Sequence, residues 1–84
     1  MYAVKWGAVW CPPCQKLDPQ LAKLVDDEGV EIFDVDVDEV DPEVQRDWGV
    51  TGIPVTFILD DNDEVVDRIV GAVPPAKILE ALNG

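Results

Sequence analysis

The chain has 84 residues, with 18 Asp and Glu against six Lys and Arg, two cysteines and no histidine. Its net charge of -12 excludes recognition of nucleic-acid phosphates, which needs clustered cations, and opposes binding to an anionic membrane. The lack of histidine excludes Ser-His-Asp and Cys-His catalysis, and two cysteines are too few for a four-ligand zinc site. The length fits one domain, residues 1–84.

The acidic composition has two main interpretations, beside a third in which it forms a binding surface. One is a solvated surface that keeps the protein soluble. The other is adaptation to a high-salt cytoplasm, where screening limits self-repulsion to a few ångströms. The first ten residues hold one cation and no signal-peptide pattern, and the apolar run at residues 53–59 is too short to span a bilayer. We therefore expect a monomer in the cytoplasm. In that compartment, a close cysteine pair is more often catalytic or metal-binding than structural.

Strand and helix patterns alternate along the chain. Residues 2–7 form an apolar run with one charge, which predicts a buried strand. Residues 13–28 repeat apolar residues on one helical face, with prolines in the first turn and Gly29 as a stop signal. Residues 30–37 alternate apolar and mostly acidic residues, which predicts a strand with one wet face.

The second half of the chain continues the alternation. Asp41 is a candidate N-cap for a short helix that should stop at Gly49. Two strands should form an antiparallel hairpin, and a proline pair should open the last helix. These elements are predicted at residues 42–48 (helix), 55–59 and 64–70 (strands) and 75–82 (helix). The order β-α-β-α-β-β-α is that of an α/β fold whose first two strands are parallel, with a right-handed crossover.

Cys11 and Cys14 are three residues apart between a strand and a helix. The first sulfur should lie at the helix N-terminus, where the dipole and free N–H groups favour a thiolate. Because Pro12 and Pro13 have no amide hydrogen, the Cys14 amide is the donor most available to the Cys11 sulfur. This pattern favours dithiol–disulfide exchange. Three alternatives remain for the pair. The two cysteines could be half of a metal site shared between two chains, a structural disulfide, or two thiols with no common role.

The segment from Trp10 to Cys14, Trp-Cys-Pro-Pro-Cys, resembles the active-site segment of the thioredoxin family. Gly52-Ile53-Pro54 resembles the second signature of that family, a loop with a cis-proline. The similarity spans the whole chain, although the family's usual first strand and helix are missing. It implies a thioredoxin-like fold, with a four-stranded mixed sheet sandwiched by helices.

The resemblance also implies a role for each matching residue. Cys11 matches the exposed nucleophile that attacks a substrate disulfide, and Cys14 matches the more buried cysteine that resolves the mixed disulfide. No metal is expected, and no cofactor beyond the redox-active Cys11–Cys14 pair. We expect a groove that receives an extended segment of the substrate, formed by Trp10, Pro12, Ile53, the cis-proline Pro54 and Ala72.

Lys5 departs from the family, which keeps a buried aspartate at this position as proton acceptor for the resolving thiol. A lysine can stabilise a thiolate, but it cannot act as that base. The other interpretation is a lysine that extends to the surface with its ammonium group in water. Residues 71–74 lack the Gly-Gly pair and acidic residues with which glutaredoxins hold glutathione. We therefore favour a thioredoxin-like activity over a glutathione-dependent one.

The sequence thus predicts an enzyme, a small dithiol–disulfide oxidoreductase. It would reduce protein disulfides through a reversible Cys11–Cys14 disulfide and receive electrons from a thioredoxin-reductase-type donor. Two alternatives stay open at this point. One is a glutaredoxin-like electron carrier for one client enzyme, such as ribonucleotide reductase. The other is a non-catalytic binding module with the same fold.

Overall fold

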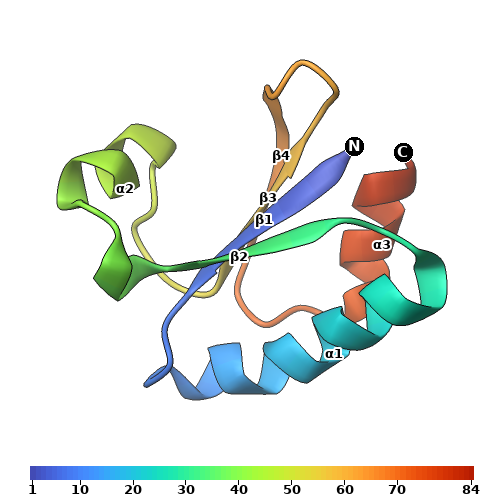
Figure 1. The fold of residues 1–84 in the computed structure, drawn as a ribbon, viewed down its shortest axis with the longest axis horizontal. Coiled ribbons are helices and arrows are strands. Elements are labelled where there is room, and N and C mark those ends of the chain that lie inside the picture. The colour runs from blue at the N-terminus through green and yellow to red at the C-terminus, as the bar shows by residue number, and fades with distance from the viewer.

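A four-stranded sheet in the order β2-β1-β3-β4 forms the centre of the computed structural model, which describes residues 1–84 (Figure 1). Strand β1 pairs parallel with β2 and antiparallel with β3, and β3 pairs antiparallel with β4. The predicted order and the parallel first pair are therefore confirmed. The strands are β1 (Tyr2–Gly7), β2 (Ile32–Asp36), β3 (Val55–Leu59) and β4 (Val65–Val70).

Strand β2 is shorter than the predicted strand at residues 30–37. The carboxylate of Asp36 accepts a hydrogen bond from the Asp38 amide, 2.9 Å away, and residues Val37–Glu39 form a turn of 3₁₀-helix. A short Asp side chain that binds its own backbone in this way competes with the strand ladder. The alternating valines alone do not reveal where that competition ends the strand.

The three helices are α1 (Pro12–Glu28), α2 (Pro42–Trp48) and α3 (Pro75–Asn83). Gly29 and Gly49 end α1 and α2 in left-handed conformations, with φ of 67° and 72°, as the stop signals predict. Asp41 holds the N-cap position of α2, but its side chain makes no capping hydrogen bond. Instead, its backbone carbonyl accepts from the amides of Val44 and Gln45, at 3.0 and 3.3 Å.

The alternation of side chains along β1 divides the core into two layers, one on each face of the sheet. Helices α1 and α3 lie together below and to the right of the sheet in Figure 1, and α2 lies on the other side. On the α1 and α3 face, the buried cluster is Ala3, Leu17, Leu21, Leu24, Ile58 and Ile78. On the α2 face, the buried cluster is Val4, Trp6, Val55, Phe57 and Leu59, with Trp48 of α2 packed against it.

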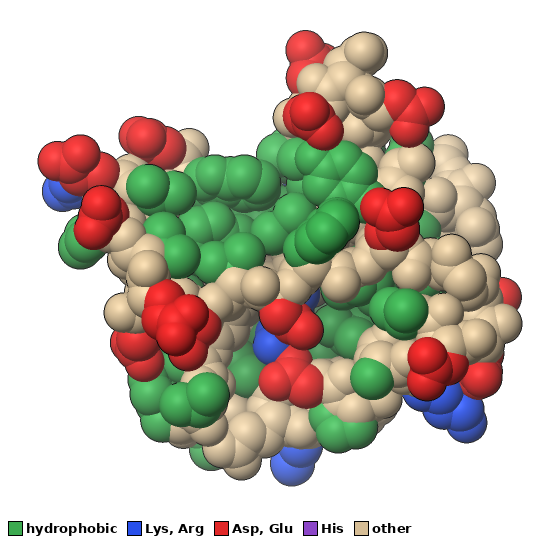
Figure 2. All heavy atoms as spheres, viewed as in Figure 1, with side chains coloured by type: hydrophobic (Ala, Val, Ile, Leu, Met, Phe, Trp, Pro, Cys, Tyr) green, Lys and Arg blue, Asp and Glu red, His purple; other side chains and the backbone are tan.

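Acidic side chains are spread over much of the face seen in Figure 2, around a central hydrophobic area beside α2. Across the whole molecule, only three ion pairs form, so most of the 18 acidic side chains have no cationic partner. The charge surplus must therefore repel itself across the surface. None of the helices is long and apolar enough to cross a membrane.

We expect added salt to raise the Tm of this protein, because screening weakens repulsion among the carboxylates. The screening length falls from about 10 Å at 0.1 M to about 3 Å at 1 M salt. Thermal unfolding in sodium chloride and sodium thiocyanate at matched low concentrations checks the cause. Screening depends on ionic strength, so both salts should stabilise equally up to about 0.3 M. A Tm that stays constant or falls in sodium chloride would contradict this expectation.

Candidate active site

Cys11 and Cys14 lie where β1 passes into α1. Cys11 is the N-cap of α1, and its sulfur accepts a hydrogen bond from the Cys14 amide at 3.4 Å. The predicted donor is therefore confirmed, since Pro12 and Pro13 follow Cys11 and have no amide hydrogen to offer. Both cysteines are free thiols. The nucleophile position thus combines a helix N-terminus with one direct amide donor.

Both thiols are buried, which corrects the expectation of an exposed Cys11. Cys11 is 4% exposed and Cys14 is 0% exposed. They form a cluster with Ala8, and the half-buried side chains of Val37 and Ile53 pack against it. The order of burial is the expected one, but Val37 lies in the 3₁₀ turn after β2, whose contact with the cysteines the motif does not encode.

The predicted cis-proline loop lies beside the cysteines. The bond between Ile53 and Pro54 is cis, Pro54 is buried, and Ile53 contacts the cysteine cluster. The Pro54 carbonyl accepts a hydrogen bond from the Gly71 amide at 2.8 Å. This bond holds the start of the loop after β4 against the proline, and exposed Ala72 follows directly.

Trp10 extends outward instead of packing on the cysteines. It is 62% exposed, and its indole nitrogen donates to the Asp38 carboxylate at 2.7 Å. Pro12 is exposed as well. The structure therefore places Ile53 against the thiols, with buried Pro54 next to it in the chain, whereas Trp10, Pro12 and Ala72 are exposed.

Two opposing sets of groups act on the Cys14 thiol. Burial raises the pKa of Cys14, and its hydrogen bond with Cys11 raises that pKa further. The Ala8 backbone and the positive charge of Lys5 act in the opposite direction, but the net pKa stays above the ordinary value. Cys14 is therefore held as the thiol until something removes its proton.

The Lys5 side chain does not extend into water, which corrects that interpretation. It is 4% exposed and points to the α1 face of the sheet, where its ammonium group pairs with Asp18 and Asp34. Neither carboxylate was predicted from the sequence, although each left a signal there. Asp18 is four residues after Cys14 on α1, and Asp34 is the register partner of Lys5 across the parallel β1–β2 pair.

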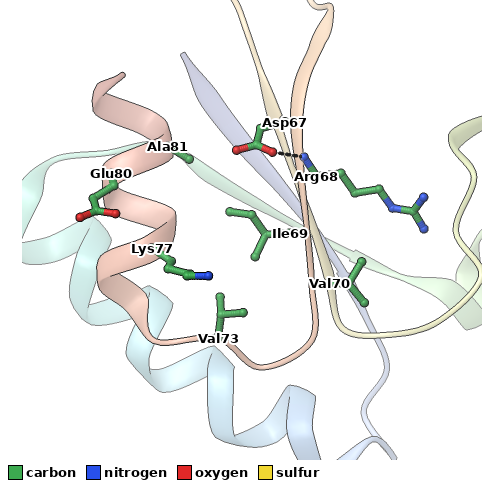
Figure 3. Close-up of a pocket in the computed structure, with 8 residues that line it drawn as sticks. All are labelled: Asp67, Arg68, Ile69, Val70, Val73, Lys77, Glu80 and Ala81. Carbon is green, nitrogen blue, oxygen red and sulfur yellow. Dashed lines mark hydrogen bonds between the residues drawn. The ribbon is translucent and has the colours of Figure 1, made fainter.

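The largest cleft in the molecule is elsewhere. It measures about 550 Å³ and lies between β4 and α3, where Ile69, Val73 and Lys77 point into it (Figure 3). No cysteine lines this cleft, and the Asp67 carboxylate at its rim accepts a hydrogen bond from the Arg68 amide at 2.7 Å. The candidate chemistry therefore resides in the buried thiol cluster and not in the largest hollow.

Comparison with known proteins agrees with this geometry. The sequence model of the thioredoxin family matches residues 1–84. Thioredoxin-2 of Pyricularia oryzae is 41% identical over 73 residues, which cover 86% of this chain and 42% of that protein. The thioredoxin of Listeria monocytogenes is 36% identical over 78 residues, which cover 90% of this chain and 74% of that protein.

Solved structures give the same result. A single-substitution mutant of thioredoxin from Halobacterium salinarum superposes with a TM-score of 0.87 at 27% identity, over 98% of this chain and 71% of that one. A reduced Schistosoma mansoni thioredoxin pre-protein has a TM-score of 0.85 at 28% identity, over 98% and 75% of the two chains. The expected thioredoxin-like fold is confirmed. Because the family's sequence model covers the whole chain, the protein belongs to the thioredoxin family of dithiol–disulfide oxidoreductases.

Proposed function

We propose that this chain reduces protein disulfides, with Cys11 as the nucleophile and Cys14 as the resolving thiol. The observation that carries the proposal is the N-cap position of Cys11, whose sulfur accepts the Cys14 amide hydrogen at 3.4 Å. The amide hydrogen bond and the helix dipole both stabilise a negative charge on that sulfur. Cys14 is fully buried beside it and can react only with Cys11 or with a substrate already bound there.

The proposed reaction transfers two electrons in two thiol–disulfide exchanges. In the first, the Cys11 thiolate attacks one sulfur of the substrate disulfide, forms a mixed disulfide and releases the other sulfur as a thiolate. In the second, Cys14 loses its proton and attacks the Cys11 sulfur. The Cys11–Cys14 disulfide then forms, and the second substrate thiolate leaves. Both released thiolates take protons from water, so the substrate is reduced and the protein dithiol is oxidised.

The substrate segment is proposed to lie along the residue before the cis-proline. Ile53 is half-buried against the cysteine cluster, and an extended peptide beside it would gain backbone hydrogen bonds of the β-strand type. Exposed Trp10, Pro12 and Ala72 stand at the rim of this position, ready to contact substrate side chains. Aromatic and small apolar groups of this kind suit a substrate surface that varies from one client to another.

Three further expectations belong to this proposal. The two cysteines carry the electrons themselves, without an added cofactor, and a flavin-containing reductase of the thioredoxin-reductase class returns them to the dithiol state. A reducing compartment such as the cytoplasm suits a protein that works from its dithiol form. The charge of -12 opposes association between copies, which supports a monomer.

A coupled assay of insulin reduction tests the proposed function. Thioredoxin reductase with NADPH should sustain catalytic insulin reduction by this protein, because the redox pair then cycles between its two states. Glutathione, glutathione reductase and NADPH should sustain little, since the acidic surface repels the glutathione anion. Efficient turnover with the glutathione system and not with thioredoxin reductase would show that the chain receives electrons from glutathione, as a glutaredoxin does. No reduction with either donor, or with dithiothreitol, would overturn the proposed function.

A further inference from the structure

The Lys5 ammonium group and the Cys14 sulfur both lie close to one small residue, Gly7. A Cβ atom placed on Gly7 would lie 2.8 Å from Lys5 Nζ and 3.1 Å from Cys14 Sγ. The nitrogen and the sulfur are therefore no more than about 6 Å apart, which is within the range where a neighbouring charge shifts a pKa. The missing side chain of Gly7 is what allows this approach.

The ammonium group is held in place by two carboxylates from different elements. Asp18 on α1 accepts a hydrogen bond from Lys5 Nζ, and an Asp34 carboxylate oxygen on β2 lies 3.4 Å from the same atom. An ammonium group has three donors, so one remains for a further partner. Burial lowers the pKa of Lys5, but the two carboxylates more than offset this and the net pKa is raised. Lys5 therefore remains positively charged throughout the neutral range.

We propose that Lys5 is a positioning residue for the second exchange, in which its fixed ammonium group stabilises the Cys14 thiolate that attacks the mixed disulfide. This inference rests on the proposed function and adds a residue to it. The family uses a carboxylate base at this position, and here the sign of the charge is reversed. Lys5 does not accept the proton; it lowers the free energy of the anion that remains when the proton leaves.

A cleft of about 220 Å³ that opens to solvent is lined by Lys5, Gly7, Asp18 and Asp34. Cys14 does not line it, but its sulfur would lie 3.1 Å from a Cβ placed on Gly7. In the proposed step, the Cys14 S–H bond breaks, its proton passes to water or a buffer base in this cleft, and the sulfur keeps the electron pair for its attack on Cys11. The ammonium group keeps its own proton throughout, so the charges balance.

Other charged and titratable groups near Cys14 set the size of the effect. Asp18 from α1 and Asp34 and Asp36 from β2 line the same cleft as Lys5, and Cys11 adjoins Cys14. The carboxylates oppose a thiolate, but Asp18 and Asp34 are 48% and 69% exposed, whereas Lys5 is buried. Water screens the exposed anions more than the buried cation, so the ammonium group has the larger influence on the sulfur. The lowering of the Cys14 pKa by Lys5 agrees with this order.

Removal of the charge should move the pH profile of the second exchange alone. In Lys5→Met, the Cys14 pKa should rise by about 1 unit, the lower end of the range for loss of an opposite charge at this distance, because two carboxylates already pair with the ammonium group. At a pH below the Cys14 pKa of both the wild type and Lys5→Met, each unit by which that pKa rises lowers the thiolate population about tenfold. The rate of resolution falls by the same factor. At a pH above the raised pKa, the rate should return toward that of the wild type. A loss of packing alone would lower the rate at every pH.

The test is stopped-flow oxidation of the reduced protein by excess 4,4′-dithiodipyridine, an uncharged disulfide. Attack by Cys11 releases the first thiopyridone in a phase that depends on reagent concentration. Attack by Cys14 releases the second in a phase that does not. The midpoint of the second phase against pH reports the Cys14 pKa. Lys23→Met is the matched control, because it removes the same charge from an exposed site on α1, roughly 13 Å along the helix from Cys14.

Gly7→Ala supplies a second variant that keeps every charge. Its Cβ would separate Lys5 Nζ from Cys14 Sγ, so its midpoint should also rise, by less than in Lys5→Met. If Lys5→Met does not fold, Gly7→Ala decides the question. A midpoint equal to that of the wild type and of Lys23→Met would overturn the role of Lys5. Absence of the second phase in the wild type would overturn the proposed function instead, so the two failures are distinct.

Discussion

Cys11→Ser is expected to lower insulin-disulfide reduction to the rate of dithiothreitol alone. Ser at the N-cap keeps the helix start and accepts the same amide hydrogen bond, so the fold should survive. A neutral hydroxyl is not a nucleophile toward a disulfide sulfur, and the raised pKa of the fully buried Cys14 keeps it as the unreactive thiol. Turbidity of precipitating insulin chains measures the rate. Equal rates in the wild type and Cys11→Ser would exclude the assigned nucleophile.

Cys14→Ser provides the matched variant for the same mechanism. It keeps the first exchange and removes the second, so Cys11 should remain attached to the substrate as a mixed disulfide. Mass spectrometry without reductant should detect the covalent adduct with one insulin chain, and added dithiothreitol should release it. Wild type should show no lasting adduct, because Cys14 resolves it. Full turnover by Cys14→Ser, with no adduct, would show that resolution comes from outside the protein.

Phe57→Ala is expected to destabilise the fold by about 3–5 kcal/mol, the usual cost of removing a buried aromatic ring. Phe57 is 2% exposed, and its ring centroid lies 5.2 Å from that of Trp48 in an edge-on arrangement. Helix α2 buries no residue of its own, and its Trp48 packs on the sheet against both Phe57 and Trp6. Small domains have a total stability of about 5–15 kcal/mol, and such a loss removes a large part of it.

Urea unfolding followed by tryptophan fluorescence and circular dichroism measures this change. Phe33→Ala is the matched control, because Phe33 is 53% exposed on the edge strand β2 and contacts only Tyr2 among the aromatic residues. Its cost should be below about 1 kcal/mol. Similar midpoints for the two variants would show that the α2 face of the sheet adds little to stability.

Local patterns predicted most of the fold because each element carries its own signals. The apolar runs and turn glycines located the strands and helices, and the spacing of Cys11 and Cys14 located the nucleophile and its amide donor. The end of β2 was missed because Asp36 turns the backbone through a hydrogen bond to its own neighbour. A period of two in the sequence does not distinguish an aspartate that faces water from one that starts a turn.

The parts of the site that the sequence did not reveal depend on contacts between distant segments. The burial of Cys11 comes from Val37 and Ile53, which reach it from two other elements. The charged environment of Lys5 needs both the register of β1 with β2 and the rotation of α1 about its own axis, which turns Asp18 toward Lys5. Sequence motifs describe which groups can react. Their accessibility and their electrostatic neighbours are set by tertiary packing.

The sheet has two open edges, β2 and β4, and such edges can pair with another copy of the chain. Three half-exposed valines on β4, namely Val65, Val66 and Val70, would favour that pairing. The edges also carry carboxylates, at Asp34 and Asp36 on β2 and Asp67 on β4. Mutual repulsion therefore protects the edges while the carboxylates are ionised. Colloidal stability should fail near the pI of about 4.1, where self-association through the sheet edges is no longer opposed.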